Sequence, residues 1–323
     1  MTLEDWANFS NDAVAAATAV LALAWLASVA QWAFGSKAVR VERAVAAAEP
    51  ALVGGGSSGA TPAISPSAAE GEAAEERSDL FGRIAFSLTV LGFLVLLAAV
   101  VTRGLAAERV PWGNMYEFSI TGICVVLGGY LVMVALLRVQ WLAPIVLGFS
   151  VVVLGLSMTV YVPAGPLVPA LDSYWLVIHV ISAMVAGAGF LVGAGASVLY
   201  LVRTRADARG GAKGYLGRLP SAASMDQLAY RVTAFSFPVW TFAALISGPI
   251  WAEHAWGRPW GWDPKEVWAF ITWVAYAGYL HARATAGWKG KAAAILSLVA
   301  FATFLFNFVG VNLFFPGLHS YAK

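Results

Sequence analysis

Apolar residues dominate long stretches of the chain, and their lengths predict its structural class. A helix needs about 20 residues to cross a bilayer, and eight stretches reach or approach that length. They are residues 13–34, 82–102, 117–137, 142–162, 174–202, 231–251, 265–285 and 292–313. The pattern predicts an all-α polytopic membrane protein with about eight transmembrane helices. An even number of crossings places both termini on the same side of the membrane.

Composition and charge strengthen this interpretation and orient the chain. The 323 residues are 60% hydrophobic and only 12% charged, whereas about a quarter of a soluble domain is charged. The net charge of +2 says little, but the positions of the charges are informative. If the termini lie outside, fifteen of the twenty lysines and arginines fall in inner connections. Because cytoplasmic loops carry an excess of these residues, the sequence predicts extracytoplasmic termini.

Three regions follow from the same pattern. Residues 1–34 are predicted to be an N-terminal transmembrane anchor, because the acidic start lacks the basic segment of a cleaved signal peptide. Residues 35–80 are predicted to be a disordered cytoplasmic linker, since most of this segment is rich in Ala, Gly, Ser and Pro and cannot build a core. Residues 81–323 are predicted to form a seven-helix domain.

Two features of the apolar runs are interpreted as packing. Cys124 is the single cysteine, which excludes an internal disulfide and a multi-cysteine metal site. The run GAGFLVGAGAS at 187–197 has small residues at the spacing of close helix contacts. Because such spacing is typical of helix contacts, we expect no nucleotide site here. We also expect no nucleic acid partner.

The segment 251–273, WAEHAWGRPWGWDPKEVWAFITW, contains six of the fourteen tryptophans. Membrane proteins normally scatter tryptophans along their interfaces, so this concentration indicates another role. An indole offers a rigid flat face and one N–H donor. We expect an extracytoplasmic loop, 251–268, that binds a planar ring, with a porphyrin as the candidate. The predicted contact residues are Trp251, Trp256, Trp260 and Trp262.

Charged residues of this segment have two interpretations each. Arg258 and Lys265 can bind the propionates of a porphyrin through charge-assisted hydrogen bonds, or can be solvated interface residues. Asp263 precedes Pro264 and is expected to cap a helix, which does not prevent it from contacting a ligand. His254 is expected to form a hydrogen bond within the loop and is not predicted to be a ligand.

The remaining histidines fall at two depths. His179 lies near the outer end of the fifth span and His319 follows the eighth; the pair could provide both axial ligands of a haem iron. For His179 alone, a hydrogen bond to a neighbouring helix is the alternative. His281 lies sixteen residues after Lys265, hence ~24 Å deeper. Its second ligand would be Met133 or, the alternative that we favour, a histidine of another subunit.

Several motifs together resemble a known family. The run WGRPWGWDPKEVW is similar to the tryptophan-rich WWD signature of haem-handling membrane proteins. The chain from about residue 80 onward most resembles the CcsA/ResC family of cytochrome c biogenesis proteins, called CcsB in some bacteria. Further similarities are NMYEF after the second span, SYWLVIHV around His179, LHAR at His281 and LHS at His319.

The resemblance implies a subunit of the cytochrome c synthase in a bacterial plasma membrane. Such a complex carries haem b outward and joins it through thioethers to the CxxCH motif of apocytochrome c, which requires thiol-reducing proteins. It implies that His179 and His319 bind haem at the extracytoplasmic face. It further implies that His281 binds haem within the membrane, together with a histidine of a ResB-type partner with a large extracytoplasmic domain.

Two other functions compete with this one. A haem exporter or chaperone shares the tryptophan motif and passes haem to a carrier without forming thioethers. A haem-b electron-transfer subunit pairs histidines at matched depths within the membrane, and His281 has no histidine at its own depth in this chain. We therefore favour the synthase subunit, with the exporter or chaperone as the alternative.

Overall fold

Helices account for all the regular structure in residues 1–53, 68–167, 169–211 and 215–319, which the computed structural model describes. The long helices are α1 (Leu3–Val53), α2 (Ala68–Ala107), α3 (Met115–Leu137), α4 (Ala143–Ser157), α5 (Tyr174–Ala208), α7 (Ala222–Thr241), α9 (Pro264–Ala284) and α10 (Lys291–Leu305). Short elements are the 3₁₀ turns η1 (Gln140–Leu142), η2 (Met158–Val160) and η3 (Pro169–Leu171), the π-helices η4 (Phe242–Ser247) and η5 (Phe306–Gly310), and α6 (Tyr215–Arg218), α8 (Gly248–Trp256) and α11 (Val311–Phe314). The predicted all-α class is confirmed.

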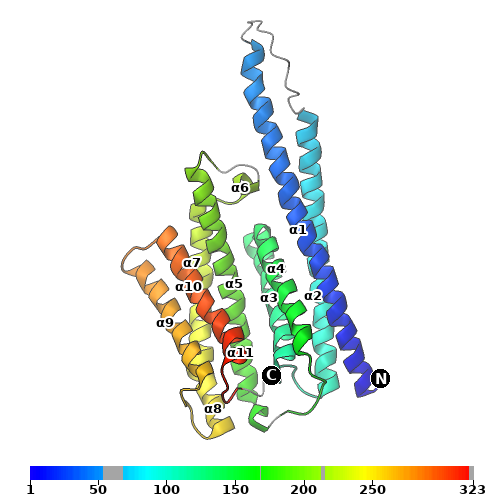
Figure 1. The fold of residues 1–323 in the computed structure, drawn as a ribbon, viewed down its shortest axis with the longest axis vertical. Coiled ribbons are helices and arrows are strands. Elements are labelled where there is room, and N and C mark those ends of the chain that lie inside the picture. Colours follow the sequence, from blue (N-terminus) through cyan, green and yellow to red (C-terminus); the bar gives the residue numbers. More distant parts are fainter. Residues whose placement is uncertain (54–67, 168, 212–214, 320–323) are drawn as a thin grey trace.

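Seven helical segments of the described chain are long and apolar enough to cross a membrane. They match seven of the eight predicted spans, with α7, η4 and α8 forming one continuous segment, Ala222–Trp256. The remaining prediction, 265–285, corresponds to α9, which has 21 residues but carries Lys265, Glu266, His281 and Arg283. These charged and polar groups keep α9 out of the apolar set, although it lies alongside α10 and α7 (Figure 1).

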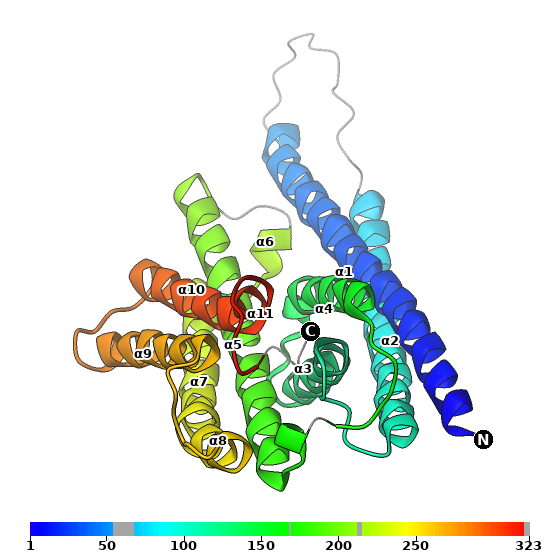
Figure 2. The same ribbon diagram turned by 60° about the horizontal axis from the view of Figure 1, so that its bottom comes forward.

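The helices form two groups (Figures 1 and 2). α1 to α4 pack together on one side, and α7 to α11 pack on the other, with α5 in contact with both. The N-terminus and α11, the last described helix, lie at the end of the bundle that carries α8 and the tryptophan loop (Figure 1). We call this the tryptophan end.

The helix that contains the predicted N-terminal anchor packs against other helices of the bundle. α1 packs along α2 and against α4, and α1 and α2 extend as helix into both sides of segment 35–80, for which a disordered linker was predicted. Alanine and glutamate dominate these flanks, and both residues favour helix. The centre of the predicted linker, 54–67, lies outside the described residues.

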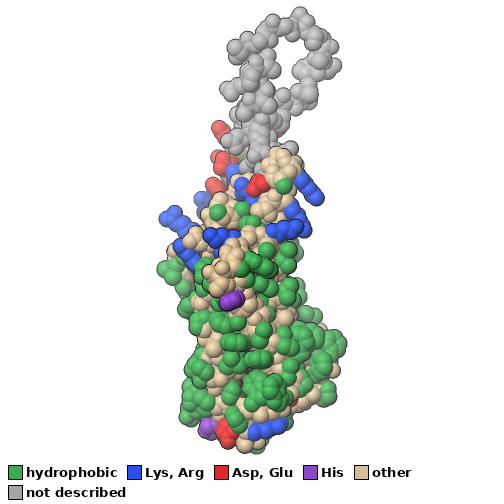
Figure 3. Space-filling view, turned by 90° about the vertical axis from the view of Figure 1, so that its left-hand side faces the viewer, with side chains coloured by type: hydrophobic (Ala, Val, Ile, Leu, Met, Phe, Trp, Pro, Cys, Tyr) green, Lys and Arg blue, Asp and Glu red, His purple; other side chains and the backbone are tan. Residues whose placement is uncertain are grey.

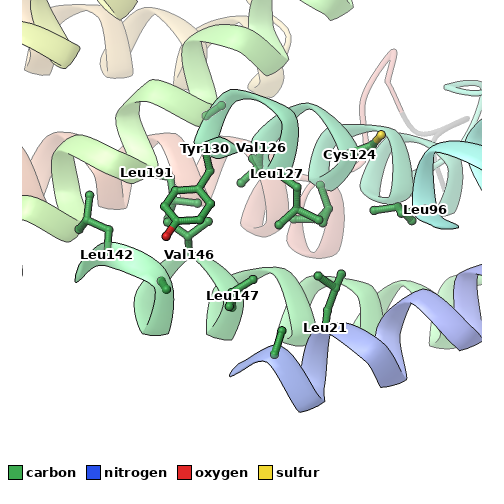
Figure 4. Packing of buried hydrophobic residues seen from close by; sticks show 14 of the residues in the cluster. Leu21, Leu96, Cys124, Val126, Leu127, Tyr130, Leu142, Val146, Leu147 and Leu191 are labelled. Carbon is green, nitrogen blue, oxygen red and sulfur yellow. The ribbon is translucent and has the colours of Figure 1, made fainter. Parts of the chain in front are cut away.

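The largest core lies among α1 to α5. Leu21, Leu96, Leu127, Leu147 and Leu191 each come from a different helix of this set and are at most 4% exposed (Figure 4). Cys124 belongs to the same cluster and is free and buried. The prediction that it serves in packing is therefore confirmed.

Small residues of α5 allow α7 to approach closely. A Cβ added to Gly189 would collide with the side chain of Ser236, and one added to Gly193 would lie 2.9 Å from the Thr233 hydroxyl. Both serine and threonine are fully buried on α7. The predicted role of the 187–197 run in close helix contact is confirmed, and this contact fixes α5 relative to α7 and η4.

Candidate functional site

A large cavity lies between the two helix groups near the tryptophan end. It contains about 1530 Å³ of empty space, counting the part that is open to solvent. Its walls come from α3, α4, α5, α8, the start of α9, α10 and η5, and most of them are apolar. The predicted residues that line it are Trp251, Trp256, Trp260, Lys265, His179 and His319.

His179 lies in the second turn of α5, and its orientation is set by the π-helix η4. Its Nδ1 is 2.9 Å from the carbonyl oxygen of Ala243. That oxygen also accepts the backbone N–H of Gly248, five residues on. A carbonyl can only accept, so the hydrogen of the imidazole is on Nδ1 and the lone pair is on Nε2. Metal-binding histidines commonly have this arrangement.

His319 is held in the same way by a carboxylate. Its Nδ1 lies 3.0 Å from Oδ1 of Asp263, while Oδ2 accepts the backbone N–H of Leu318 at 2.6 Å. Burial raises the pKa of Asp263, but the bonds from His319 and Leu318 outweigh burial and lower that pKa below its ordinary value. An ionised Asp263 requires the hydrogen of His319 on Nδ1, so that Nε2 carries the lone pair.

Burial lowers the pKa of His319, and the Asp263 carboxylate offsets only part of this effect. An unperturbed histidine titrates near 6.5. The imidazole of His319 is therefore neutral at physiological pH, which is the form that binds metals.

The two imidazoles contact the same indole. Trp251 is only 3% exposed. The ring of His179 stacks on it with 5.9 Å between centroids, and the ring of His319 meets it edge-on at 5.6 Å. Trp256 adds an edge-on contact to His319 at 5.1 Å. The structure thus brings together the two histidines that lie 140 positions apart in the sequence.

The tryptophan loop is ordered by the first turn of α9. Asp263 is the N-cap of this helix and forms a capping box with Glu266, as the DPKE sequence predicted. Glu266 Oε2 accepts the backbone N–H groups of Gly261 at 2.8 Å and of Asp263 at 3.1 Å. The residue that orients His319 is therefore fixed by the helix that follows it.

Some predicted contact residues lie apart from the cavity. Trp262 is 70% exposed, and Arg258 is exposed as well; neither belongs to the lining. Of the two cations predicted to meet propionates, Lys265 alone lines the cavity. His254 is exposed and its Nδ1 bonds the Ile250 carbonyl of its own helix at 2.8 Å. The hydrogen bond that was predicted for His254 within its own segment is thus present.

His281 lies on α9 with an exposed side chain, away from the cavity lining. No side-chain hydrogen bond or ion pair joins it to another described residue. Met133, the intramolecular alternative for its second ligand, belongs to α3 and packs against the α1–α5 core. α3 and α9 lie in opposite helix groups (Figure 2), so Met133 does not meet His281.

Most of the lining was not assigned to the cavity from the sequence, including Trp112, Asn114, Glu266 and Asn307. Asn114 is the first residue of the NMYEF motif and Trp112 lies two residues before it, so the motif could have indicated both. Asn307 lies in the π-helix η5, and its buried Oδ1 has no hydrogen-bond partner among the described residues. An asparagine inside the last apolar run was the available signal, because buried amides normally have partners.

Comparisons with known proteins agree on one family. The family model described as cytochrome C assembly protein matches residues 112–319. The cytochrome c biogenesis protein CcsA of Parasynechococcus marenigrum is 34% identical over 264 residues, covering 72% of this chain and 85% of that protein. CcsA of Chlamydomonas reinhardtii is 42% identical over 158 residues, covering 49% of this chain and 43% of that protein.

A solved structure has a similar fold. The structure named cytochrome c heme lyase CcmF matches with a TM-score of 0.62 and 18% identity, covering 97% of this chain and 50% of that chain. Identity this low supports a shared fold and no more. The family match spans the cavity-lining residues from Trp112 to His319. On this match and on the identity to CcsA, the chain belongs to the cytochrome c assembly protein family and has a role in cytochrome c biogenesis.

Proposed function

We propose that the cavity binds haem b, with His179 and His319 as the two axial ligands of its iron. One observation carries the proposal: two histidines that lie 140 positions apart in the sequence line one cavity with indole walls. Each has Nδ1 tied to an acceptor, the carbonyl of Ala243 or the carboxylate of Asp263. In each of the two imidazoles, the lone pair that can bind a metal is therefore on Nε2.

The donor set suits an iron that brings its own equatorial ligands. Among the described residues no group of three or more His, Cys, Asp or Glu side chains could hold a metal ion. Two imidazoles supply axial ligands only, and a porphyrin supplies the other four nitrogens. Apolar walls suit the ring, while Lys265 and the buried Trp260 Nε1, which has no hydrogen-bond partner among the described residues, can donate to carboxylates.

We propose that the chain acts as a subunit of the cytochrome c synthase. Bound haem would supply the vinyl groups that become thioethers with the CxxCH cysteines of apocytochrome c. The contribution of the chain is positioning. Ala243 and Asp263 orient the two imidazoles, Trp251 and Trp256 exclude water from their vicinity, and the capping box of α9 holds the loop in place.

A second haem site is proposed at His281, between this chain and a ResB-type partner. The exposed stripe of α9 that ends at His281 is apolar, with Ile271, Val274 and Gly278 at helical spacing. Gly278 has open space around it, which allows a ring to approach the helix. Since Met133 is on the other side of the molecule, the second ligand would come from the partner.

The orientation proposed for the site is extracytoplasmic. Lysine and arginine side chains gather at the end of the bundle opposite the tryptophan end, with a hydrophobic band between (Figure 3). Under the positive-inside rule this basic end faces the cytoplasm. Apocytochrome c would then meet the haem at the outer face of a bacterial plasma membrane.

Haem titration of detergent-purified protein tests the axial ligands. We expect His179→Ala and His319→Ala to weaken haem binding by at least roughly 10- to 100-fold, the loss that removal of a mere partner of a metal ligand commonly causes. Imidazole added to the buffer should restore part of the spectrum. The matched control is His254→Ala, because His254 bonds within its own helix outside the cavity. Equal affinity in all three variants would contradict the assignment.

Thioether formation separates the synthase from the exporter or chaperone. The chain is purified with its partner, supplied with haem and incubated under reducing conditions with a CxxCH peptide. Mass spectrometry of a haem–peptide adduct would support the synthase. Haem binding without any adduct, followed by transfer to a soluble acceptor, would support the alternative. His281→Ala should lower the haem content of the complex but leave the titrated affinity of the isolated chain unchanged.

A further inference from the structure

A buried ionic cluster lies beside the cavity, in the NMYEF segment. Glu117 in the first turn of α3 is fully buried. Its Oε1 accepts Arg103 Nε at 3.0 Å, and its Oε2 accepts Arg109 Nη1 at 2.6 Å. Oε2 also accepts the backbone N–H of Gly113 at 2.8 Å. One carboxylate thus joins the end of α2, the α2–α3 connection and α3.

The two arginines extend the cluster to a second connection. Arg103, itself fully buried, donates through Nη2 to the carbonyl of Val162 at 2.5 Å. Arg109 donates through Nε to the carbonyl of Gly165 at 3.0 Å. Both carbonyls belong to the segment between α4 and α5. Glu117 therefore holds together two connections that are separated by two helices in the sequence.

Both connections supply walls of the cavity. The α2–α3 connection carries Trp112, which directly precedes Gly113, whose backbone N–H donates to Glu117. On the other side of Trp112, the carbonyl of Pro111 accepts a hydrogen bond from the hydroxyl of Thr121 at 2.9 Å. The second carries Leu171, which is 3% exposed. Trp112 and Leu171 pack in the same apolar cluster as Trp251. All three side chains line the cavity.

Burying three charged side chains is unfavourable unless they are paired with good geometry. Here each arginine bonds both Glu117 and a backbone carbonyl of a connecting segment, while Nη1 of Arg103 has no hydrogen-bond partner among the described residues. These connecting segments would otherwise have few constraints. A cluster of this kind is suited to specifying one conformation of these segments. Its position next to the cavity links that conformation to ligand binding.

We propose that Trp112 contacts the cavity ligand and that Glu117 is the positioning residue that sets Trp112 in the wall. The identity of the ligand as haem rests on the proposed function, whereas the positioning by Glu117 does not. The site then takes indoles from two separate parts of the chain, the tryptophan loop and the α2–α3 connection.

Hydrogen–deuterium exchange of the full chain without haem tests the positioning. Glu117→Gln leaves both arginines without their anion, and we expect exchange at 109–113, where the amides of Arg109, Trp112 and Gly113 are hydrogen-bonded, to accelerate by about tenfold or more. The matched control is Glu75→Gln, which removes the exposed Glu75–Arg218 ion pair. Equal exchange in the two variants would overturn the positioning role. If Glu117→Gln does not accumulate, Arg109→Lys keeps the charge but removes the forked geometry, and it should show the same local change more weakly.

Haem titration tests the contact. Trp112→Phe should weaken haem binding roughly three- to tenfold, in line with the energy of an aromatic contact, with unchanged exchange at 109–113. Trp288→Phe is the control, because Trp288 is 47% exposed in the α9–α10 connection. Equal affinities for Trp112→Phe and Trp288→Phe would overturn the contact. Failure of the wild type to bind haem would count against the proposed function, while the exchange experiment would still decide the role of Glu117.

Discussion

Asp263 combines two roles, the helix cap that the sequence predicted and the orientation of His319, which the structure adds. It caps α9 through the backbone N–H of Lys265, 3.1 Å from its Oδ1, and it binds His319 through the same oxygen. A cap needs only a side-chain oxygen, so asparagine could replace it there. Oδ2 of Asp263 accepts the backbone N–H of Leu318, whereas asparagine has a donating NH2 group at this place, so the segment that carries His319 would lose its acceptor. The two roles can therefore be separated by one substitution.

We expect Asp263→Asn to keep the fold and weaken haem binding by about 10- to 100-fold, the range found when partners of metal-binding histidines are removed. Haem titration and circular dichroism of the same preparation measure the two effects. Glu253→Gln is the control, since Glu253 is an exposed carboxylate of the same segment. A variant with normal haem affinity would show that Asp263 acts as a helix cap only.

The lowered pKa of His319 makes stability depend on pH in a defined direction. The unfolded chain takes up a proton at this histidine near pH 6.5, whereas burial keeps the folded imidazole neutral to lower pH. The unfolded state then binds more protons, so stability is full above about 6.5 and declines as pH falls toward the folded pKa.

The melting temperature of the haem-free protein should therefore fall between pH 7 and pH 5, and it should fall less in His319→Gln. The depressed pKa of Asp263 acts in the same direction but at lower pH, because its unfolded value is near 3.9. Identical profiles for the wild type and His319→Gln between pH 7 and pH 5 would contradict the linkage.

At the scale of the element, the π-helix η4 is the feature that directs His179. Its extra residue brings the carbonyl of Ala243 to the imidazole, and π-bulges of this kind are frequent at functional sites. Gly248 follows directly, and a Cβ there would lie 3.2 Å from both Cε1 and Nδ1 of His179 and 3.0 Å from the Ala243 oxygen. The absence of a side chain at this position leaves room for the ring.

Gly248→Ala should displace the His179 ring and weaken haem binding by about tenfold, a partial loss relative to removal of the ligand. Gly155→Ala is the matched control, because a Cβ at Gly155 of α4 meets no atom within 4 Å. The measurement is the haem titration, with thermal melting to exclude unfolding. Unchanged affinity would mean that the ring moves without consequence, and η4 would then have no directing role.

Local sequence signals predicted the elements better than their irregularities. The helices followed from long apolar runs, and the start of α9 followed from the DPKE cap. The π-helices could not be predicted, because one extra residue in a turn changes no hydrophobic pattern. The Arg103–Glu117 ion pair could not be predicted either, because its two residues lie on opposite sides of the α2–α3 connection and meet only when α2 and α3 pack together.

The residues of the candidate site were also predicted only in part from the sequence. His179, His319 and Trp251 were found because unusual residue types stand in a sparse background, with four histidines in the whole chain. Trp262 stands in the same run and yet is 70% exposed. Its backbone φ of 57° is in the left-handed region, which turns the loop at that residue. Spacing in sequence does not show on which side of such a turn an indole lies.

At the scale of the whole molecule, the direction in which the bundle crosses the membrane decides which compartment the cavity serves. The basic end and the tryptophan end carry one exposed tryptophan each in a connection, Trp288 and Trp262. In a Cys124→Ala background, which removes the buried native thiol, Trp262→Cys and Trp288→Cys place single reporters at the two ends. We expect a membrane-impermeant maleimide to label Trp262→Cys in intact bacterial cells and Trp288→Cys only after the cells are opened. The reverse pattern would place the cavity at the cytoplasmic face. Haem delivery to an extracytoplasmic apocytochrome c would then require a site elsewhere, and the synthase proposal would fail even if both histidines bind haem.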